Sequence, residues 1–214
     1  MYISVKPHFE DYSRSYQQKL QSFTTFADTG RDMEFSYCEI QGLTIITPTV
    51  FGDSRGYFYE SYHKGKFYEN GLDLDFVQDN QSLSGKGILR GLHFQNPPYE
   101  QGKLIRVIEG AIIDVVVDIR KSSPSYGKSF QIELNAENKV MFWVPPGFAH
   151  GFCTLEDRTI VTYKCTGLYS PENEDGLMWN DPGLAIDWPL EQEPLLSAKD
   201  TEYTPFSEFV SPFE

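Results

Sequence analysis

Short runs of alternating apolar and polar residues, separated by turn residues, recur along the chain from about residue 40 onward. Alternation with a period of two places side chains on the two faces of a β-strand. Asn96-Pro97-Pro98, Ser122-Ser123-Pro124 and Pro145-Pro146-Gly147 are clear turn signals between the runs. Many short strands with almost no helix between them predict a mainly β fold, either an antiparallel sandwich or a small barrel. We expect the strands at residues 43–46, 57–62, 75–78, 87–94, 103–109, 111–119, 129–134, 140–144, 151–155 and 159–166.

The two ends of the chain follow different patterns. Tyr12, Tyr16, Leu20 and Phe23 recur at helical spacing, which predicts a short amphipathic helix in an N-terminal appendage of residues 1–39. We expect this helix to pack on the main domain of residues 40–214, and a partner-binding role is the alternative. Residues 167–214 contain six prolines and lose periodicity, so a loop-rich C-terminal wrap is expected there.

Composition and charge narrow the class of protein. The chain has 214 residues, a formal net charge of −13 and three widely spaced cysteines. The acidic balance argues against nucleic-acid binding, which needs a basic face, and no apolar run is long enough to span a membrane. Few cysteines without a CxxC pair are typical of a reducing, cytoplasmic location. Residues 81–128 nevertheless carry seven basic and four acidic residues, which indicates either an internal anion site or ordinary scatter of surface charge.

His93 is a candidate base in the expected strand at residues 87–94. Strict alternation places Arg90 on the opposite face from His93, unless Gly91 bulges the strand. On a face that lines a barrel, burial disfavours the imidazolium and keeps the imidazole available as a base. A hydrogen-bonded core histidine is the alternative.

His150 ends a PxGxxH turn, which is typical of the cupin sandwich, or double-stranded β-helix. Metal-binding cupins would pair it with an HxH motif, but this chain reads His93-Phe94-Gln95 at the matching place. A stable transition-metal site needs several converging nitrogen, oxygen or sulfur ligands. The sequence therefore predicts a cupin barrel without a catalytic metal and without another cofactor.

Three cations and two tyrosines could complete a site around His93. Arg55 and Arg90 suit forked contacts to phosphate oxygens, and Lys103 at the start of a strand could stabilise an oxyanion. Tyr163 could serve as an acid opposite a base. Taken singly, each cation could be an ordinary surface charge, and Tyr163 and Tyr169 could be packing residues. Together they indicate a site for a diphosphate-bearing substrate that undergoes proton abstraction.

The chain resembles the dTDP-4-dehydrorhamnose 3,5-epimerase family of nucleotide-sugar enzymes. The resemblance covers about residues 40–202 and follows the family's order of motifs. The matching strings are Phe51-Gly52-Asp53-Ser54-Arg55-Gly56-Tyr57-Phe58-Tyr59-Glu60, Phe76-Val77-Gln78-Asp79-Asn80, Leu89-Arg90-Gly91-Leu92-His93-Phe94-Gln95, Gln101-Gly102-Lys103-Leu104, Asp114-Val115-Val116-Val117-Asp118-Ile119-Arg120, residues 145–152, Tyr163-Lys164, Trp179-Asn180-Asp181-Pro182 and Leu196-Ser197-Ala198-Lys199-Asp200.

The resemblance implies a metal-free cupin-type, jelly-roll-like sandwich, a homodimer that exchanges N-terminal strands, and a substrate of the dTDP-4-keto-6-deoxyglucose type. It implies that His93 is the base, that Asp200 orients it, that Lys103 stabilises the enolate oxygen and that Tyr163 returns a proton from the opposite face. Tyr169 matches the tyrosine that stacks on thymine. Further positions match residues that hold the nucleotide, diphosphate or sugar: Arg55, Glu60, Gln78, Asp79, Asn80, Arg90, His150, Glu174 and Lys199.

The expected activity is inversion at C3 and C5 of a dTDP-4-keto-6-deoxyhexose, as in dTDP-L-rhamnose biosynthesis. Three alternatives stay open. The first is a related enzyme that epimerises only C3 or only C5, or isomerises the keto group. The second is a metal-dependent cupin oxygenase, which would need more ligands than His93 and His150. The third is a non-catalytic sugar-nucleotide binding module, which would not need the pair of His93 and Tyr163.

Overall fold

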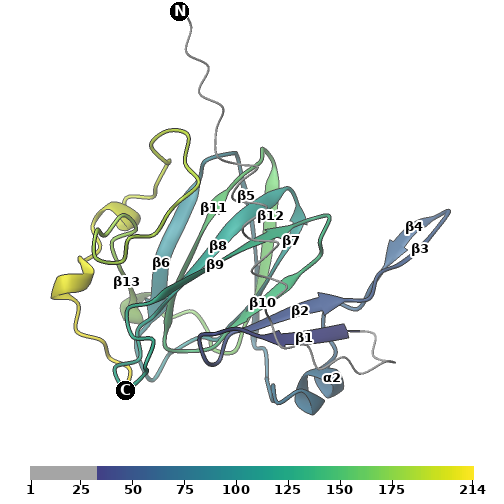
Figure 1. The fold of residues 1–214 in the computed structure, drawn as a ribbon, viewed down its shortest axis with the longest axis horizontal. Coiled ribbons are helices and arrows are strands. Elements are labelled where there is room, and N and C mark those ends of the chain that lie inside the picture. The colour runs from purple at the N-terminus through teal and green to yellow at the C-terminus, as the bar shows by residue number, and fades with distance from the viewer. Residues whose placement is uncertain (1–32) are drawn as a thin grey trace, which may run out of the picture.

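The computed structural model describes residues 33–214, which form two antiparallel β-sheets packed face to face (Figure 1). The six-stranded sheet runs through β1 (Met33–Tyr37), β2 (Thr44–Pro48), β10 (Met141–Val144), β7 (Lys103–Glu109), β12 (Thr159–Cys165) and β5 (Gln78–Ser84). The five-stranded sheet runs through β13 (Glu174–Gly176), β6 (Leu89–Gln95), β11 (Phe148–Thr154), β8 (Ala111–Asp118) and β9 (Ser129–Asn135). The sandwich predicted from sequence is therefore confirmed.

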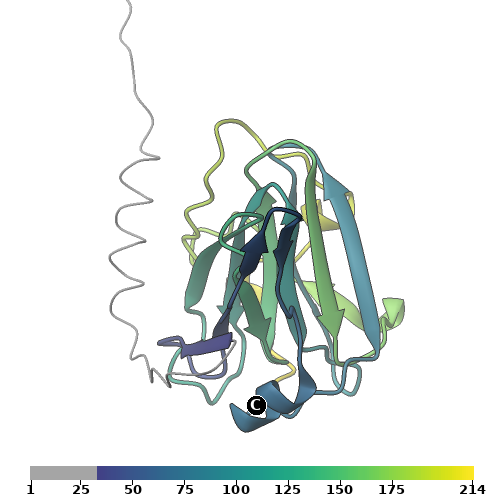
Figure 2. The ribbon, with the colours of Figure 1, turned by 90° about the vertical axis from the view of Figure 1, so that its right-hand side faces the viewer.

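Shorter elements flank the two sheets. The hairpin of β3 (Phe51–Asp53) and β4 (Gly56–Phe58) projects away from both sheets (Figure 1). The helix α2 (Lys64–Glu69) lies at one end of the sandwich (Figure 2), where its buried Phe67 packs against the six-stranded sheet. Three single 3₁₀ turns lie in the C-terminal part: η1 (Pro171–Asn173), η2 (Lys199–Thr201) and η3 (Phe206–Glu208). Within residues 33–214, no helix is long and apolar enough to cross a membrane.

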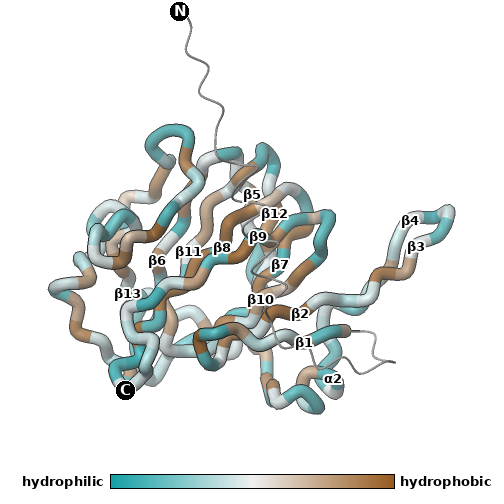
Figure 3. The backbone as a smooth tube through the Cα atoms, in the orientation of Figure 1, coloured by the Kyte–Doolittle hydropathy of each residue, from teal (hydrophilic) through white to brown (hydrophobic). Residues whose placement is uncertain are grey.

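Apolar side chains fill the space between the sheets and also cover the outer face of the five-stranded sheet. Ile105, Val116 and Phe142 belong to the central cluster between the sheets. Leu184 and Trp188 of the C-terminal wrap pack on the outer face of β6, β8 and β11. Because both faces of β8 are covered, all of its residues are buried. Figure 3 shows the hydrophobic positions gathered along the strands.

The strand predictions hold best where strands are apolar. The expected strand at residues 103–109 coincides with β7, and the one at 111–119 coincides closely with β8. β5, by contrast, was expected at 75–78 but runs over 78–84. The prediction was wrong here because the inward side chains of β5 are polar: Gln78, Asn80, Ser82 and Ser84. Polar residues that line a cavity hide the usual apolar alternation of a strand.

The N-terminal boundary differs from the expectation in one respect. Residues 33–37 form β1, which pairs with β2 and so joins the six-stranded sheet, although the main domain was expected to begin at residue 40. The pattern Met33-Glu34-Phe35-Ser36-Tyr37 alternates as a strand should, but it is only five residues long. The expected helix around Tyr12 and Tyr16 lies outside the described residues.

A bulge in β6 decides which side chains enter the sandwich. His93 pairs with His150 of β11, whereas Arg90 pairs with Phe152, so the ladder shifts register between them. The shift places Arg90 and His93 on the same inward face, which is the outcome expected if Gly91 bulges the strand. A Cβ at Gly91 would lie 2.5 Å from Cα of Gly151, so this close approach of two backbones requires glycine.

Candidate active site

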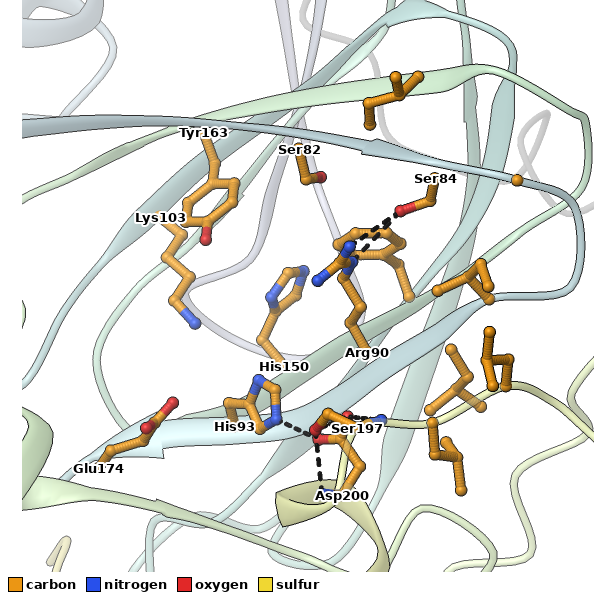
Figure 4. Close-up of a pocket in the computed structure, with 17 residues that line it drawn as sticks. Ser82, Ser84, Arg90, His93, Lys103, His150, Tyr163, Glu174, Ser197 and Asp200 are labelled. Carbon is orange, nitrogen blue, oxygen red and sulfur yellow. Dashed lines mark hydrogen bonds and ion pairs between the residues drawn. The ribbon is translucent and has the colours of Figure 1, made fainter.

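A cavity of about 570 Å³ opens between the two sheets, a size typical of small-molecule sites (Figure 4). It is lined from the five-stranded sheet by Arg90, His93, His150 and Glu174, among others, and from the six-stranded sheet by Lys103, Tyr163, Ser82 and Ser84. A smaller adjoining hollow shares His93, Lys103, Tyr163 and Glu174, and adds Gln78, Asn80 and Tyr169. Ten of the residues expected from sequence thus line these two adjoining cavities: Gln78, Asn80, Arg90, His93, Lys103, His150, Tyr163, Tyr169, Glu174 and Asp200.

His93 is held by a carboxylate from the far end of the chain. Its Nε2 lies 2.5 Å from Oδ1 of Asp200, whose side chain is only 2% exposed. Ser197 donates its hydroxyl to Oδ2 of the same carboxylate at 2.7 Å. Burial would raise the pKa of Asp200, but the hydrogen bonds from His93 and Ser197 outweigh it and hold that pKa below its usual range. Asp200 therefore stays charged and fixes one ring nitrogen, which leaves the other nitrogen free to accept a proton.

A second histidine–carboxylate pair lies next to the first. His150 stands directly opposite His93 in the ladder of β6 and β11. Its Nε2 lies 2.9 and 3.0 Å from the two oxygens of Asp114 on β8, which is fully buried. Burial lowers the pKa of His150, so its imidazole is neutral and donates Nε2–H to the carboxylate. The other nitrogen of His150 is then an acceptor for a substrate hydroxyl.

Lys103 begins β7, and this half-buried side chain brings its ammonium group to the cavity. Burial lowers the pKa of Lys103, and the nearby carboxylates of Asp114 and Glu174 oppose that shift. A cation in a site that excludes water interacts strongly with a developing negative charge. Lys103 is therefore suited to stabilise an oxyanion that forms within the cavity.

Tyr163 enters the cavity from the sheet opposite His93. It lies on β12 of the six-stranded sheet, whereas His93 lies on β6 of the five-stranded sheet. Figure 4 shows the two side chains on opposite sides of the cavity, with the Lys103 ammonium group between them. Burial raises the pKa of Tyr163, while Arg90 and a hydrogen bond with Asn80 partly offset the shift. A neutral phenol so placed is suited to donate a proton across the cavity from His93.

A hydrogen-bonded group of polar residues closes one end of the cavity. Glu174 of β13 accepts a hydrogen bond from the Tyr169 hydroxyl at 2.8 Å and pairs with Lys199. Burial raises the pKa of Glu174, but the bonds from Lys199 and Tyr169 outweigh it and keep the carboxyl charged. Gln78 accepts from the backbone N–H of Tyr169 at 2.8 Å, and its side-chain amide donates to Asn80 at 3.0 Å. These contacts pre-form a polar surface beside the exposed Tyr169 ring.

Three residues expected at the site do not line the cavity of their own chain. Arg55 is at the tip of the β3–β4 hairpin, where it pairs with Asp53 and its side chain is 88% exposed. Glu60 pairs with Lys66 of α2. Asp79 pairs with Lys164 on the outer face of the six-stranded sheet, since alternation along β5 turns it away from Gln78 and Asn80.

Sequence reasoning missed several residues that the structure brings to the site. Asp114 was noted only as part of a matching string, although an acidic residue within the apolar run Ala111-Ile112-Ile113-Asp114-Val115 was a usable signal. Buried charges are rare unless they are paired. Ser84 accepts hydrogen bonds from Arg90, and Ser197 donates to Asp200. Ser197 was noted only as part of a matching string, and no sequence pattern singles out Ser84.

Metal ligation has little support in the described part of the chain. Within residues 33–214, no group of three or more His, Cys, Asp or Glu side chains is arranged to hold a metal ion. His93 and His150 are neighbours, but each is already bonded to a carboxylate.

We expect Asp114→Asn to lower kcat about 10- to 100-fold, the usual cost of losing a partner that orients a functional group. The neutral amide removes a charge that opposes the downward pKa shift of Lys103. The role expected for Lys103 requires its protonated form, so the alkaline limb of the pH–rate profile should move to lower pH in this variant. A pH–rate profile checks both effects. Asp187→Asn at an exposed position is the control, and an unchanged alkaline limb in Asp114→Asn would contradict the coupling.

The fold and the cavity together define a cupin-type sandwich enzyme whose site is suited to moving protons at carbon. Comparison with known proteins gives the family. The sequence model of the family described as dTDP-4-dehydrorhamnose 3,5-epimerase matches residues 37–208. The chain belongs to this family and is an isomerase, so the family and the epimerase function expected from sequence are confirmed.

Individual relatives agree with this assignment. The dTDP-4-dehydrorhamnose 3,5-epimerase of Methanothermobacter thermautotrophicus is 49% identical over 179 residues, which cover 83% of this chain and 96% of that protein. A crystal structure of the dTDP-6-deoxy-D-glucose-3,5-epimerase of Legionella pneumophila in complex with dTDP-4-keto-L-rhamnose has 48% identity and a TM-score of 0.76, covering 78% and 89% of the two chains. A 3'-monoepimerase of Streptomyces bikiniensis, in complex with dTDP-quinovose, has 32% identity and a TM-score of 0.76, covering 79% and 86%.

Proposed function

We propose that this chain inverts both C3 and C5 of a dTDP-4-keto-6-deoxyhexose, with His93 as the base and Tyr163 as the acid. The observation that carries the proposal is the placement of these two side chains on opposite sheets, across one cavity that also holds Lys103 (Figure 4). Inversion requires removal of a proton from one face of a carbon and its return to the other face. A single base would mostly restore the original centre.

Each inversion consists of two proton transfers. His93 removes the proton next to the C4 ketone, and the bonding pair moves into the ring while the C4 oxygen gains negative charge. The Lys103 ammonium group stabilises that enolate oxygen, which makes the weakly acidic C–H bond accessible to an imidazole. Tyr163 then gives its phenolic proton to the same carbon from the opposite face, and the C4 carbonyl re-forms. Exchange with solvent restores the proton of Tyr163 and removes the one on His93.

The remaining cavity residues suit the nucleotide and the sugar. Arg90 on the inward face of β6 offers a forked donor for diphosphate oxygens. The exposed ring of Tyr169 is available for stacking on thymine. His150 offers a ring nitrogen to a sugar hydroxyl. The group of Glu174, Lys199, Gln78 and Asn80 supplies further donors and acceptors at the same end of the cavity.

The proposed function is tested by incubating the protein with dTDP-4-keto-6-deoxyglucose in D₂O and following the product by NMR. We expect deuterium at both C3 and C5, each with inverted configuration. Deuterium and inversion at only one carbon would replace this proposal with a single-centre epimerase, the activity named for the Streptomyces bikiniensis relative. Deuterium at neither carbon would reject proton transfer by this site.

The proposed chemistry needs only side chains, so we expect turnover to survive removal of metal ions. Dialysis against EDTA followed by a turnover assay checks this expectation. A parallel sample to which Zn²⁺, Fe²⁺ or Mn²⁺ is returned serves as the control. Loss of activity that a single added metal restores would favour the metal-dependent alternative over the proposed mechanism.

We infer that the protein acts as a homodimer in which the β3–β4 hairpin of one copy reaches the cavity of the other. The hairpin projects from the sandwich and exposes three aromatic side chains, Phe51, Tyr57 and Phe58 (Figure 1). Clustered exposed aromatics are typical of interaction surfaces. The arrangement would also account for Arg55, which matches a nucleotide-binding position but lies outside the cavity of its own chain. Glu60, which directly follows the hairpin, would approach the same cavity.

A mixing experiment tests the shared site. His93→Asn and Arg55→Ala are purified separately, assayed at low substrate concentration, and then mixed under conditions that allow subunit exchange. In a mixed dimer, one cavity receives an intact His93 and the intact hairpin of its partner, so activity should recover to about a quarter of the wild-type value. Mixed activity no greater than the mean of the two variants would reject the contribution of the hairpin.

We propose a reducing, cytoplasmic location. Cys38, Cys153 and Cys165 are all free in the structure, and two of them are buried. Burial raises the pKa of the Cys153 thiol to about 11, which keeps it protonated and unreactive at neutral pH. Thiol titration of unfolded protein purified without reductant should find three free thiols.

A further inference from the structure

The ring of His93 has a second neighbour besides Asp200. Tyr203 makes an edge-to-face contact with His93, with ring centroids 5.6 Å apart and an angle of 66° between the ring planes. Such contacts favour a defined relative orientation of two rings. Asp200 holds one nitrogen of His93 through a hydrogen bond, but one bond leaves the tilt of the imidazole plane undetermined. The contact with Tyr203 supplies the missing restraint.

The position of Tyr203 is itself closely defined. The backbone N–H of Glu202 donates to the carbonyl of Lys199 at 3.0 Å, and the carbonyl of Thr204 accepts from Met178 at 3.1 Å. Both neighbours of Tyr203 in the chain are thus anchored. Its ring lies against Gly176, where a Cβ would come within 2.7 Å of two ring atoms.

The pairing of β13 with β6 explains why the Tyr203 ring lies beside His93. Gly176 of β13 is the residue directly opposite His93 in β6. The absence of a side chain at position 176 leaves room for the Tyr203 ring next to the imidazole. Asp200 and Tyr203 therefore reach His93 from one short segment of the C-terminal wrap.

The hydroxyl of Tyr203 is not suited to take part in proton transfer as a base. Burial, together with the nearby carboxylates of Glu174 and Asp200, raises the pKa of Tyr203 to about 12. The phenol stays neutral at neutral pH, and the contact that the structure shows between Tyr203 and His93 is made by the ring.

We propose that Tyr203 is a positioning residue, whose ring holds the His93 imidazole in the orientation needed to remove a proton from the substrate. This inference rests on the proposed role of His93 as the base. In this arrangement the Asp200 carboxylate fixes one nitrogen of His93, and the Tyr203 ring fixes the plane of the imidazole. A small misplacement of a catalytic group costs up to about 100-fold in rate.

The test compares Tyr203→Ala with Tyr203→Phe, using kcat, KM and the binding of dTDP. We expect Tyr203→Ala to lower kcat about 10- to 100-fold per dTDP-binding site, with KM and dTDP affinity within about twofold of wild type. Tyr203→Phe keeps the ring and should retain a kcat within about twofold of wild type. Counting sites by dTDP titration removes the contribution of unfolded protein.

Three results would overturn the inference. The first is a wild-type kcat in Tyr203→Ala, and the second is an equal loss in Tyr203→Phe, which would assign the effect to the hydroxyl. The third is a loss that disappears when activity is normalised to dTDP-binding sites, which would make the role purely structural. If Tyr203→Ala does not fold, Tyr203→Leu fills the same space without a flat ring. A wild-type kcat in Tyr203→Leu would also overturn the inference. Failure of the proposed function can be distinguished from failure of this inference, because the wild-type protein would then show no deuterium exchange at C3 or C5.

Discussion

His93→Asn is expected to abolish epimerisation while leaving the nucleotide bound. The side-chain amide of asparagine can still donate a hydrogen bond to the Asp200 carboxylate, but it cannot take a proton from carbon. Loss of a positioned general base typically costs about 10²- to 10⁴-fold in rate. Exchange of deuterium at C3 and C5 should fall with turnover, because both begin with the same proton removal. Binding of dTDP should persist, since the proposed nucleotide contacts are made by Arg90, Tyr169 and the polar group around Glu174, which the variant leaves in place.

The matched control for this variant is His63→Asn. His63 caps the N-terminus of α2, where its ring accepts a hydrogen bond from the backbone N–H of Lys66. Asparagine is a favourable capping residue, so this change preserves the helix and removes a histidine that does not line the cavity. Near-wild-type turnover or exchange in His93→Asn, measured by NMR in D₂O, would show that another group is the base.

Tyr163→Phe is expected to separate exchange from inversion. The variant keeps the aromatic ring but removes the phenolic hydroxyl that we propose as the proton donor opposite His93. The enolate should still form, and His93 or water should return the proton from the original side. Net inversion should therefore fall about 10²- to 10⁴-fold, the usual contribution of a general acid. The rate of deuterium exchange at C3 or C5 should fall less than the rate of inversion, and the rate of inversion at C5 should fall most.

Two measurements on the same samples decide the role of Tyr163. NMR of the product reports deuterium content and configuration at each carbon. Tyr68→Phe, on the exposed surface of α2, is the control for loss of a phenolic hydroxyl away from the cavity. Inversion of both centres at the native rate in Tyr163→Phe would reject this tyrosine as the donor.

The candidate residues show which parts of a site can be recognised from local sequence. His93, Lys103 and Tyr163 stand in short motifs whose residue types already indicate proton transfer, and the structure brings all three to one cavity. Arg55 stands in an equally clear motif but lies on a projecting hairpin. A motif therefore indicates which chemistry a residue suits, but not where in the fold that residue lies.

The strands also differ in how well the sequence pattern located them. The runs that became β7 and β8 were recognisable because a strand buried in a core carries a dense apolar pattern. β5 was misplaced because its inward residues face the cavity and are polar. The sequence interpretation thus failed where a strand serves the site instead of the core.

By itself, the residue pattern determined a mainly β, antiparallel fold, the loop-rich C-terminal wrap and the residue types of the site, because these follow from patterns a few residues long. It left open whether the strands form a sandwich or a small barrel. Tertiary structure alone decided that Arg90 and His93 share a face, since the shift of register arises where the backbones of Gly91 and Gly151 come close. It also decided that His150 is held by Asp114. These contacts join residues tens of positions apart in the chain, and which of them meet depends on how whole strands pair.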